Sequence, residues 1–237
     1  MDEEKSKEMT GFSNMRTTDV LLVSGKRGTG KTFFVKWYIK EHLLGRVSVF
    51  IYDPLWQYGD LGEVVHDLNE ANSKQGVMKS NKALVYQPSP EDDNLDVFDD
   101  VAGWVLQRKN IVLVGEEINE YMTPNMITPQ FRALVRRGRN YGIGIFAVTH
   151  RPAYLSLNFL NMIDHWFIFQ QDLKRDLERL YEYMERANPE IDEDFIAGLP
   201  DRHFIHYFRD RDTGKAKAVP MKPVKPKEKI ETQTVGK

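Results

Sequence analysis

The stretch GKRGTGKT, residues 25–32, constrains the fold of this 237-residue chain more than any other feature. It matches the pattern G-x-x-x-x-G-K-[ST], follows the apolar run DVLLVS and opens the helical pattern TFFVKWYIKEHLL. Glycines let the backbone curl so that several N–H groups point at one anion, and the helix N-terminus adds positive potential. The stretch therefore predicts a phosphate-binding loop between a buried strand and a helix.

The residues of this loop have distinct expected roles. Lys31 is expected to reach the β- and γ-phosphates of a nucleotide, and the Thr32 hydroxyl to take one position on Mg²⁺. The predicted nucleotide-binding residues are Gly25, Lys26, Arg27, Gly28, Thr29, Gly30, Lys31, Thr32 and Phe33. ATP and Mg²⁺ are the expected ligands.

Apolar strand patterns and helical patterns alternate along the rest of the chain. Strands are expected at 19–24, 47–52, 83–87, 111–114, 143–149, 165–170 and 203–208, and helices at 32–44, 94–109, 128–141 and 172–187. Continuous apolar strands separated by helices predict an α/β fold with a mainly parallel central sheet covered by helices on both faces. Ligands of such sheets gather at the carboxyl ends of the strands.

The two ends of the chain have a different character from this pattern. Residues 1–16 are polar and predict a flexible arm, residues 17–209 form the predicted ATPase domain, and the Lys- and Pro-rich residues 210–237 predict an extended or disordered tail. No apolar run approaches the ~20 residues that span a membrane, so we expect a soluble chain that is not secreted. The chain has no cysteine, which excludes disulfides and thiolate zinc sites.

Two adjacent carboxylates follow the apolar strand in NIVLVGEEINEY, residues 110–121. A P-loop NTPase needs one carboxylate near Mg²⁺ and a base that orients the attacking water. Adjacent residues at a strand end point in different directions, so Glu116 is predicted to serve the metal and Glu117 to act as the base. In the other possible register, Gly115 takes the metal position and Glu116 becomes the base.

The order of several further segments resembles the FtsK/HerA superfamily of hexameric DNA-pumping ATPases. The segments are YDPLWQYGDLG (52–62), EEINEY (116–121), VRRGRNYGIGIFAVTHRPAYL (135–155), QDLKRDLERLYEYM (171–184) and IAGLPDRHFIHYF (196–208). The resemblance covers roughly residues 17 to 209 and implies a RecA-like (ASCE) P-loop core. It also favours the Glu116/Glu117 register, with Glu116 in place of the usual Asp.

The resemblance also implies roles for residues outside the P-loop. It implies a ring, expected to be a hexamer, in which one subunit inserts an arginine finger into its neighbour's ATP site. Arg139 matches the position of that arginine, and Arg136 and Arg137 are alternatives. His150 stands where the family has a glutamine that senses the γ-phosphate, with Thr149 as the second choice. Asp53 is expected either to be structural or to lie near the nucleotide.

A chain with its P-loop at residue 25 and no membrane span resembles most closely the genome-packaging ATPases of tailless icosahedral viruses with an internal membrane. This implies a motor that packages double-stranded DNA into a preformed capsid, in the host cytoplasm or at the virion vertex, with a capsid or vertex membrane protein as a further partner. The polar loop 72–82, with three lysines, is a candidate DNA-contacting pore loop.

Four other functions compete with packaging. A non-viral HerA-like translocase of a plasmid or mobile element shares the same motifs, and a regulatory ATP-binding module shares the P-loop. A small-molecule kinase needs neither the tandem carboxylate nor the arginine block. A GTPase is disfavoured because NKAL, residues 81–84, departs from N-K-x-D at its fourth position.

Overall fold

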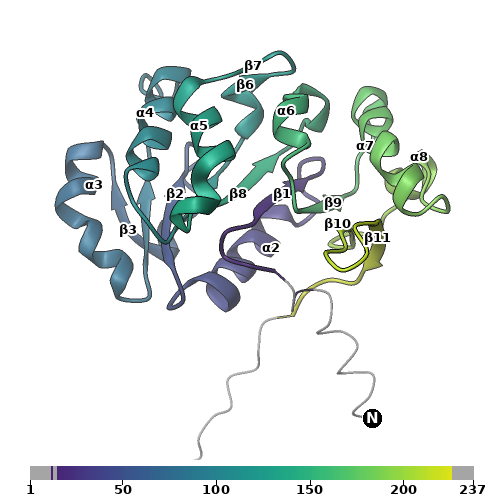
Figure 1. The fold of residues 1–237 in the computed structure, drawn as a ribbon, viewed down its shortest axis with the longest axis horizontal. Helices are drawn as coiled ribbons and strands as arrows, with labels where there is room; N and C mark the ends of the chain where they lie inside the picture. Colours follow the sequence, from purple (N-terminus) through teal and green to yellow (C-terminus); the bar gives the residue numbers. More distant parts are fainter. Residues whose placement is uncertain (1–11, 13–14, 226–237) are drawn as a thin grey trace, which may run out of the picture.

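A computed structural model of the chain describes residue 12 and residues 15–225 (Figure 1). Its centre is a nine-stranded sheet with the order β11-β10-β9-β1-β8-β5-β2-β4-β3. The strands are β1 (Val20–Ser24), β2 (Ser48–Tyr52), β3 (Gly62–Val65), β4 (Ala83–Tyr86), β5 (Ile111–Gly115), β8 (Gly144–Thr149), β9 (His165–Phe169), β10 (Phe204–Arg209) and β11 (Ala216–Met221). In this spatial order, all neighbouring strands between β9 and β3 are parallel. β10 pairs antiparallel with both β9 and β11.

The position of β1 within this sheet decides the class of the fold. β1 pairs with β8 on one side and β9 on the other, so β8 separates the strand of the P-loop from β5, the strand of the two glutamates. Because these strands are parallel neighbours, the carboxyl ends of β1, β8 and β5 lie next to one another. The predicted α/β P-loop fold with a mainly parallel sheet is confirmed.

The helices cover both faces of the sheet, as the sequence predicts. They are α2 (Lys31–Tyr38), continued by a π-helical turn (Ile39–Leu43), α3 (Leu68–Lys74), α4 (Leu95–Leu106), α5 (Pro129–Arg137), α6 (Leu157–Leu160), α7 (Lys174–Ala187) and α8 (Glu193–Ala197). Figure 1 shows α4 and α5 side by side on one face. None of the helices in the described part of the chain is long and apolar enough to cross a bilayer.

Two apolar clusters fill the space between the sheet and its helices. Side chains alternate along a strand, so Leu22 of β1 belongs to the cluster under α4 and α5, whereas Val23 belongs to the cluster under α2. The side chain of Asn94 caps the first turn of α4 by accepting from the amides of residues 96 and 97. Pro129 begins α5, where the missing N–H is tolerated.

The sheet continues past residue 209, the predicted end of the ATPase domain. Residues 216–221 form β11, which pairs with β10 along its whole length and so extends the sheet beyond that boundary. β3 and the short hairpin of β6 (Met122–Thr123) and β7 (Met126–Ile127) were also not predicted. Of the predicted N-terminal arm, Phe12 and Met15 pack against the cluster under α2. The rest of the arm up to residue 14, and the tail from 226 onwards, lie outside the described residues.

Candidate active site

The P-loop connects β1 to α2 at the carboxyl edge of the sheet. Gly30 has φ 96° and caps α2, and a Cβ placed there would lie 2.9 Å from Cγ of Arg202. A side chain at this position would therefore suffer both backbone strain and a close contact. The conformation leaves the N-terminus of α2 open towards a pocket of about 510 Å³, a volume typical of ligand sites.

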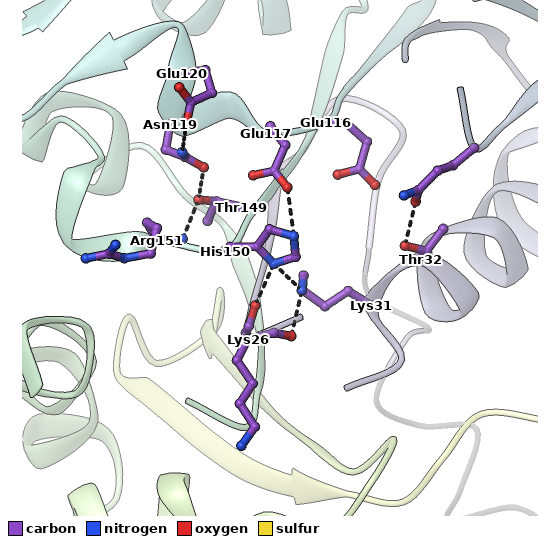
Figure 2. Close-up of polar contacts among 12 residues, drawn as sticks. Lys26, Lys31, Thr32, Glu116, Glu117, Asn119, Glu120, Thr149, His150 and Arg151 are labelled. Atoms are coloured by element: carbon purple, nitrogen blue, oxygen red, sulfur yellow. Dashed lines mark hydrogen bonds and ion pairs between the residues drawn. The ribbon is translucent and has the colours of Figure 1, made fainter. Parts of the chain in front are cut away.

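Residues of three strand ends line this pocket together with the P-loop. Its lining consists of Arg27, Gly28, Gly30, Lys31, Thr32, Phe33, Leu55, Gln57, Glu116, Glu117 and His150. Most of the P-loop residues predicted to bind nucleotide, both glutamates and His150 are therefore brought together. Figure 2 shows the side chains of Lys31, Thr32, Glu116, Glu117 and His150 pointing towards one another.

Lys31 is buried and is held inside the loop. Its Nζ donates to the backbone oxygen of Lys26 at 2.9 Å and lies 2.7 Å from Nδ1 of His150. Burial lowers the pKa of Lys31 to about 8, against the opposing effect of the two glutamates. A polyphosphate next to Nζ would favour the charged form of Lys31 by supplying the missing counter-charge.

The Thr32 hydroxyl points across the pocket and donates to Oε1 of Gln57 at 3.0 Å. Gln57 follows β2 in the segment YDPLWQYGDLG and was not predicted as a site residue. The contact places a neutral carboxamide next to the predicted magnesium ligand Thr32. The only sequence signal for it was the resemblance of this segment to the family pattern.

Glu116 follows Gly115, the last residue of β5, and is only 3% exposed. Its carboxylate accepts a hydrogen bond from the hydroxyl of Tyr58, which is fully buried. Burial raises the pKa of Glu116 to about 7, and the Tyr58 hydrogen bond opposes that rise. Glu116 makes no ion pair with a lysine or arginine among the described residues, although the charge of Lys31 acts on it from across the pocket.

Glu117 follows with its backbone in the left-handed region, at φ 48°. Its Oε1 lies 2.7 Å from Nε2 of His150. Gly115 remains inside β5, paired with Tyr52 and Ala147. Both glutamates thus line the pocket, as the Glu116/Glu117 register requires, and their separate roles stay predictions.

His150 follows β8 and lies between Lys31 and Glu117, as Figure 2 shows. Nδ1 lies 2.7 Å from Nζ of Lys31 and 3.1 Å from the backbone oxygen of Gly25. When Nδ1 of the neutral ring accepts from the Lys31 ammonium, the proton sits on Nε2 and is donated to Glu117. The hydrogen bond to Glu117 raises the pKa of His150 above its usual value, against the effect of burial. The imidazole therefore links the P-loop lysine to the predicted base.

The second-choice sensor, Thr149, is buried and does not line the pocket. Its hydroxyl donates to Oδ1 of Asn119 at 2.6 Å and accepts from the amide of Arg151 at 2.9 Å. Thr149 therefore ties the turn after β5 to the loop after β8. Between the two sensor candidates, only His150 reaches the pocket.

Asp53 is buried at the end of β2 and is fully engaged by the protein. Its carboxylate accepts from the amides of Gln57 and Tyr58, both at 2.8 Å, and from Nε2 of Gln87 at 2.9 Å. It does not line the pocket. Asp53 thus shapes the loop that carries Gln57 and Tyr58.

Arg139 lies before β8, at the end of the sheet opposite the pocket of its own chain. Its guanidinium is 2.6 Å from Oδ2 of Asp164 and 3.8 Å from Oδ1 of Asp19, and the Asp164 hydrogen bond raises its pKa. Arg136 and Arg137 are exposed on α5. None of the three can reach the P-loop of the same subunit, so each stays a candidate only for a neighbour's site.

The candidate pore loop, 72–82, lies before β4, at the same end of the sheet as Arg139. Oδ1 of Asn72 accepts from the Trp104 indole at 2.9 Å, and Lys74 pairs with Glu63 at 3.0 Å. Lys79 and Lys82 are exposed. The structure thus leaves two of the three lysines available, and contact with DNA stays a prediction.

Comparisons with known proteins support the resemblance. No family model matches the chain. The chain is 26% identical over 210 residues, 86% of each protein, to a protein named DNA packaging ATPase P9 from Enterobacteria phage PRD1. It is similar to the genome packaging NTPase B204 of Sulfolobus turreted icosahedral virus 2 in complex with ATPγS, with a TM-score of 0.68 and 21% identity over 89% of this chain and all of that one.

A more distant fold match is VirB4 of Thermoanaerobacter pseudethanolicus, with a TM-score of 0.62 and 11% identity over 87% of this chain and 89% of that chain. The resemblance predicted from the motifs, to viral genome-packaging ATPases, is therefore confirmed by the comparisons.

Proposed function

We propose that this chain is an ATP-driven motor that packages double-stranded DNA into a preformed viral capsid. The observation that carries the proposal is the pocket in which Lys31, Glu116 and Glu117 converge, on a chain similar over 86% of its length to a DNA packaging ATPase. A P-loop lysine with two carboxylates suits hydrolysis of a nucleoside triphosphate, whereas a passive binding module needs no base.

The residues of the pocket suit a Mg²⁺-nucleotide complex. The described residues contain no group of three or more His, Cys, Asp or Glu that could hold a metal by themselves. Mg²⁺ commonly takes only one or two protein ligands and completes its shell with water and substrate phosphates. The Thr32 hydroxyl and the buried Glu116 carboxylate fit that pattern, and Mg²⁺ would neutralise charge on the β- and γ-phosphates.

In this proposal, Glu117 carries the chemical step. Its carboxylate orients a water and accepts a proton from it as the water oxygen attacks the γ-phosphorus. The bond from the γ-phosphorus to the β,γ-bridging oxygen breaks, its electron pair stays on ADP, and inorganic phosphate leaves. Lys31 stabilises the phosphate oxygens, and His150 holds Glu117 until it is engaged.

Translocation requires more than one copy of the chain in this proposal. A homo-oligomeric ring, expected to be a hexamer, would place an arginine of one subunit, with Arg139 as first choice, at the nucleotide of the next. An arginine supplied in trans is worth about 10³ to 10⁵ in rate in related phosphoryl-transfer enzymes. The ring would grip DNA through its phosphates, without reading bases, at a capsid vertex or in the host cytoplasm.

The test is steady-state ATP hydrolysis with and without double-stranded DNA. Wild type should turn over ATP faster with DNA, and Glu117→Gln should bind ATP but lose roughly 10² to 10⁴ in rate. Glu116→Gln should shift the Mg²⁺ requirement. If Glu117→Gln is nearly normal while Glu116→Gln is inactive, the register is Gly115-Glu116. Hydrolysis that DNA does not stimulate would contradict the motor.

A further inference from the structure

Two exposed apolar side chains stand beside the mouth of the nucleotide pocket. Trp56 is 60% exposed and Leu55 is 47% exposed, and Leu55 also lines the pocket. Trp56 has φ 56°, which is uncommon for a bulky residue and unfavourable. Its indole N–H donates to the backbone oxygen of Pro88 at 3.3 Å, which fixes the ring on the surface. We call Leu55 and Trp56 the Trp56 knob.

A cluster of carboxylates follows Pro88, the residue that anchors the indole. Residues 91–96 are all exposed and include Glu91, Asp92, Asp93 and Asp96. None of these four carboxylates makes an ion pair with a cation in the described part of the chain. Asp93 accepts hydrogen bonds from the hydroxyls of Tyr52 and Tyr121, and the surface next to the Trp56 knob is acidic, with no cation paired to it.

A hollow surrounded by basic side chains lies on α5. A hollow of about 260 Å³ is lined by Pro129, Arg132, Ala133, Arg136 and Arg137. All three arginines are exposed, and none pairs with an acid among residues 15–225. The hollow thus offers a small apolar floor between unpaired guanidinium groups. We call it the α5 hollow.

We infer that the Trp56 knob of one copy of this chain docks into the α5 hollow of the next copy, an inference that rests on the proposed ring. An indole is the best aromatic partner for a guanidinium, and tryptophan and arginine are the residues most enriched at interface hot spots. The carboxylates beside the knob would meet the arginines around the hollow. The two surfaces are therefore complementary in both shape and charge.

The geometry gives this contact a direction. The knob and the hollow are different surfaces of one chain, so their contact is heterologous, and repeated heterologous contacts build rings or filaments. Because the knob stands at the mouth of the pocket, docking carries α5 of the neighbour towards that nucleotide. The contact would therefore bring the C-terminal end of α5, and the turn after it that carries Arg139, towards the nucleotide pocket of the neighbour.

Cross-linking tests the contact directly, because the chain has no native cysteine. Leu55→Cys keeps the indole, and Ala133→Cys marks the floor of the hollow. With a short bismaleimide, each single variant should stay monomeric on a denaturing gel, their mixture should give dimers only, and the double variant should give a ladder up to the ring. Self-linked Leu55→Cys dimers, or a double variant without a ladder, would overturn the inference.

Association measured by mass photometry provides an independent test. Trp56→Ala and Arg136→Glu should each raise the dissociation constant between subunits at least about tenfold, as expected for hot-spot residues. Mixing them should restore heterodimers, because one intact knob can meet one intact hollow. Phe195→Ala, which removes an aromatic side chain that is 39% exposed on α8, is the matched control and should associate normally.

The outcomes separate this inference from the proposed function. If wild type hydrolyses ATP and responds to DNA but no ladder forms, the interface is wrong and the motor survives. If the ladder forms without any hydrolysis, the interface stands and the motor is wrong. If Arg136→Glu loses DNA binding while the ladder is unchanged, the α5 hollow holds DNA instead of a second copy, and the inference is overturned.

Discussion

The Nε2 atom of His150 lies 2.7 Å from Oε1 of Glu117, so the predicted base is engaged by the side chain predicted to sense the γ-phosphate. The other ring nitrogen of His150 lies 2.7 Å from Nζ of Lys31. A triphosphate that draws the lysine towards its own oxygens would leave Nδ1 with the backbone oxygen of Gly25, 3.1 Å away, as its partner. The imidazole therefore gives the pocket a direct physical link between phosphate binding and the freedom of Glu117.

The first prediction concerns the acidic side of the pH–rate profile. The hydrogen bond to Glu117 raises the pKa of His150, so the ring is more readily charged below that pKa and holds Glu117 more tightly. The ATPase rate of wild type should therefore fall by up to about tenfold per pH unit as pH drops through that pKa. His150→Gln cannot become charged and should lose this limb of the profile.

The measurement is kcat for ATP between about pH 5.5 and pH 8.5, a range that brackets an ordinary histidine pKa. His203→Gln is the control, since the His203 ring hydrogen-bonds to the backbone oxygen of Asp201 and does not line the pocket. An identical acid limb in wild type and His150→Gln would show that another group titrates.

The second prediction concerns Tyr58 and the metal requirement. The Tyr58 hydroxyl holds down the pKa of Glu116, which burial raises to about 7. Tyr58→Phe should raise that pKa further, leaving more of Glu116 protonated near neutral pH. The Mg²⁺ concentration for half-maximal ATP hydrolysis should rise about tenfold, a usual effect of removing a group that orients a metal ligand.

The pH dependence of the Mg²⁺ requirement provides a stricter test of this prediction. Mg²⁺ binds the charged carboxylate, so the difference between Tyr58→Phe and wild type should shrink as pH rises above both pKa values. Tyr183→Phe on α7 is the control. A Mg²⁺ requirement that stays the same in Tyr58→Phe at every pH would mean that Tyr58 does not act through Glu116.

Local patterns predicted the parts of this protein that are local in sequence. The P-loop is a run of eight residues, and its strand and helix flanks are contiguous with it. The strands β1, β2, β4, β5, β8, β9 and β10 are apolar because both of their faces are covered, and each was predicted within a few residues. The comparisons then confirmed the fold class that these elements indicated.

Contacts between distant segments could not be predicted in the same way. Tyr58 and Glu116 meet only because β2 and β5 are paired neighbours in the sheet, so the hydrogen bond between them has no local signature. β11 was predicted as tail because it contains Lys217 and Pro220. Those residue types are also typical of an edge strand, which must avoid pairing with other chains.

The third prediction concerns Asp53, which the sequence left between a structural and a nucleotide-binding role. Asp53→Ala leaves the amides of Gln57 and Tyr58 and the Gln87 carboxamide without their acceptor. The free energy of unfolding should fall by about 3 kcal/mol, as expected for losing buried hydrogen bonds to a charged group. Urea denaturation measures the change, and unaltered stability with loss of ATP binding would favour the nucleotide role.

The fourth prediction concerns the end of the folded domain. A chain ending at Arg209 loses β11 and with it the ladder on β10, buried Ala218 and the bond from Nδ2 of Asn188 to the Ala218 oxygen. It should unfold at lower temperature and self-associate through the open edge of β10. A chain ending at Lys225 keeps those contacts and the bond from the Trp37 indole to the Lys225 oxygen, so it should melt like the full chain. Thermal melting with light scattering as the readout compares the two truncated chains. Equal melting temperatures would mean that β11 contributes no stability and that the domain ends at residue 209.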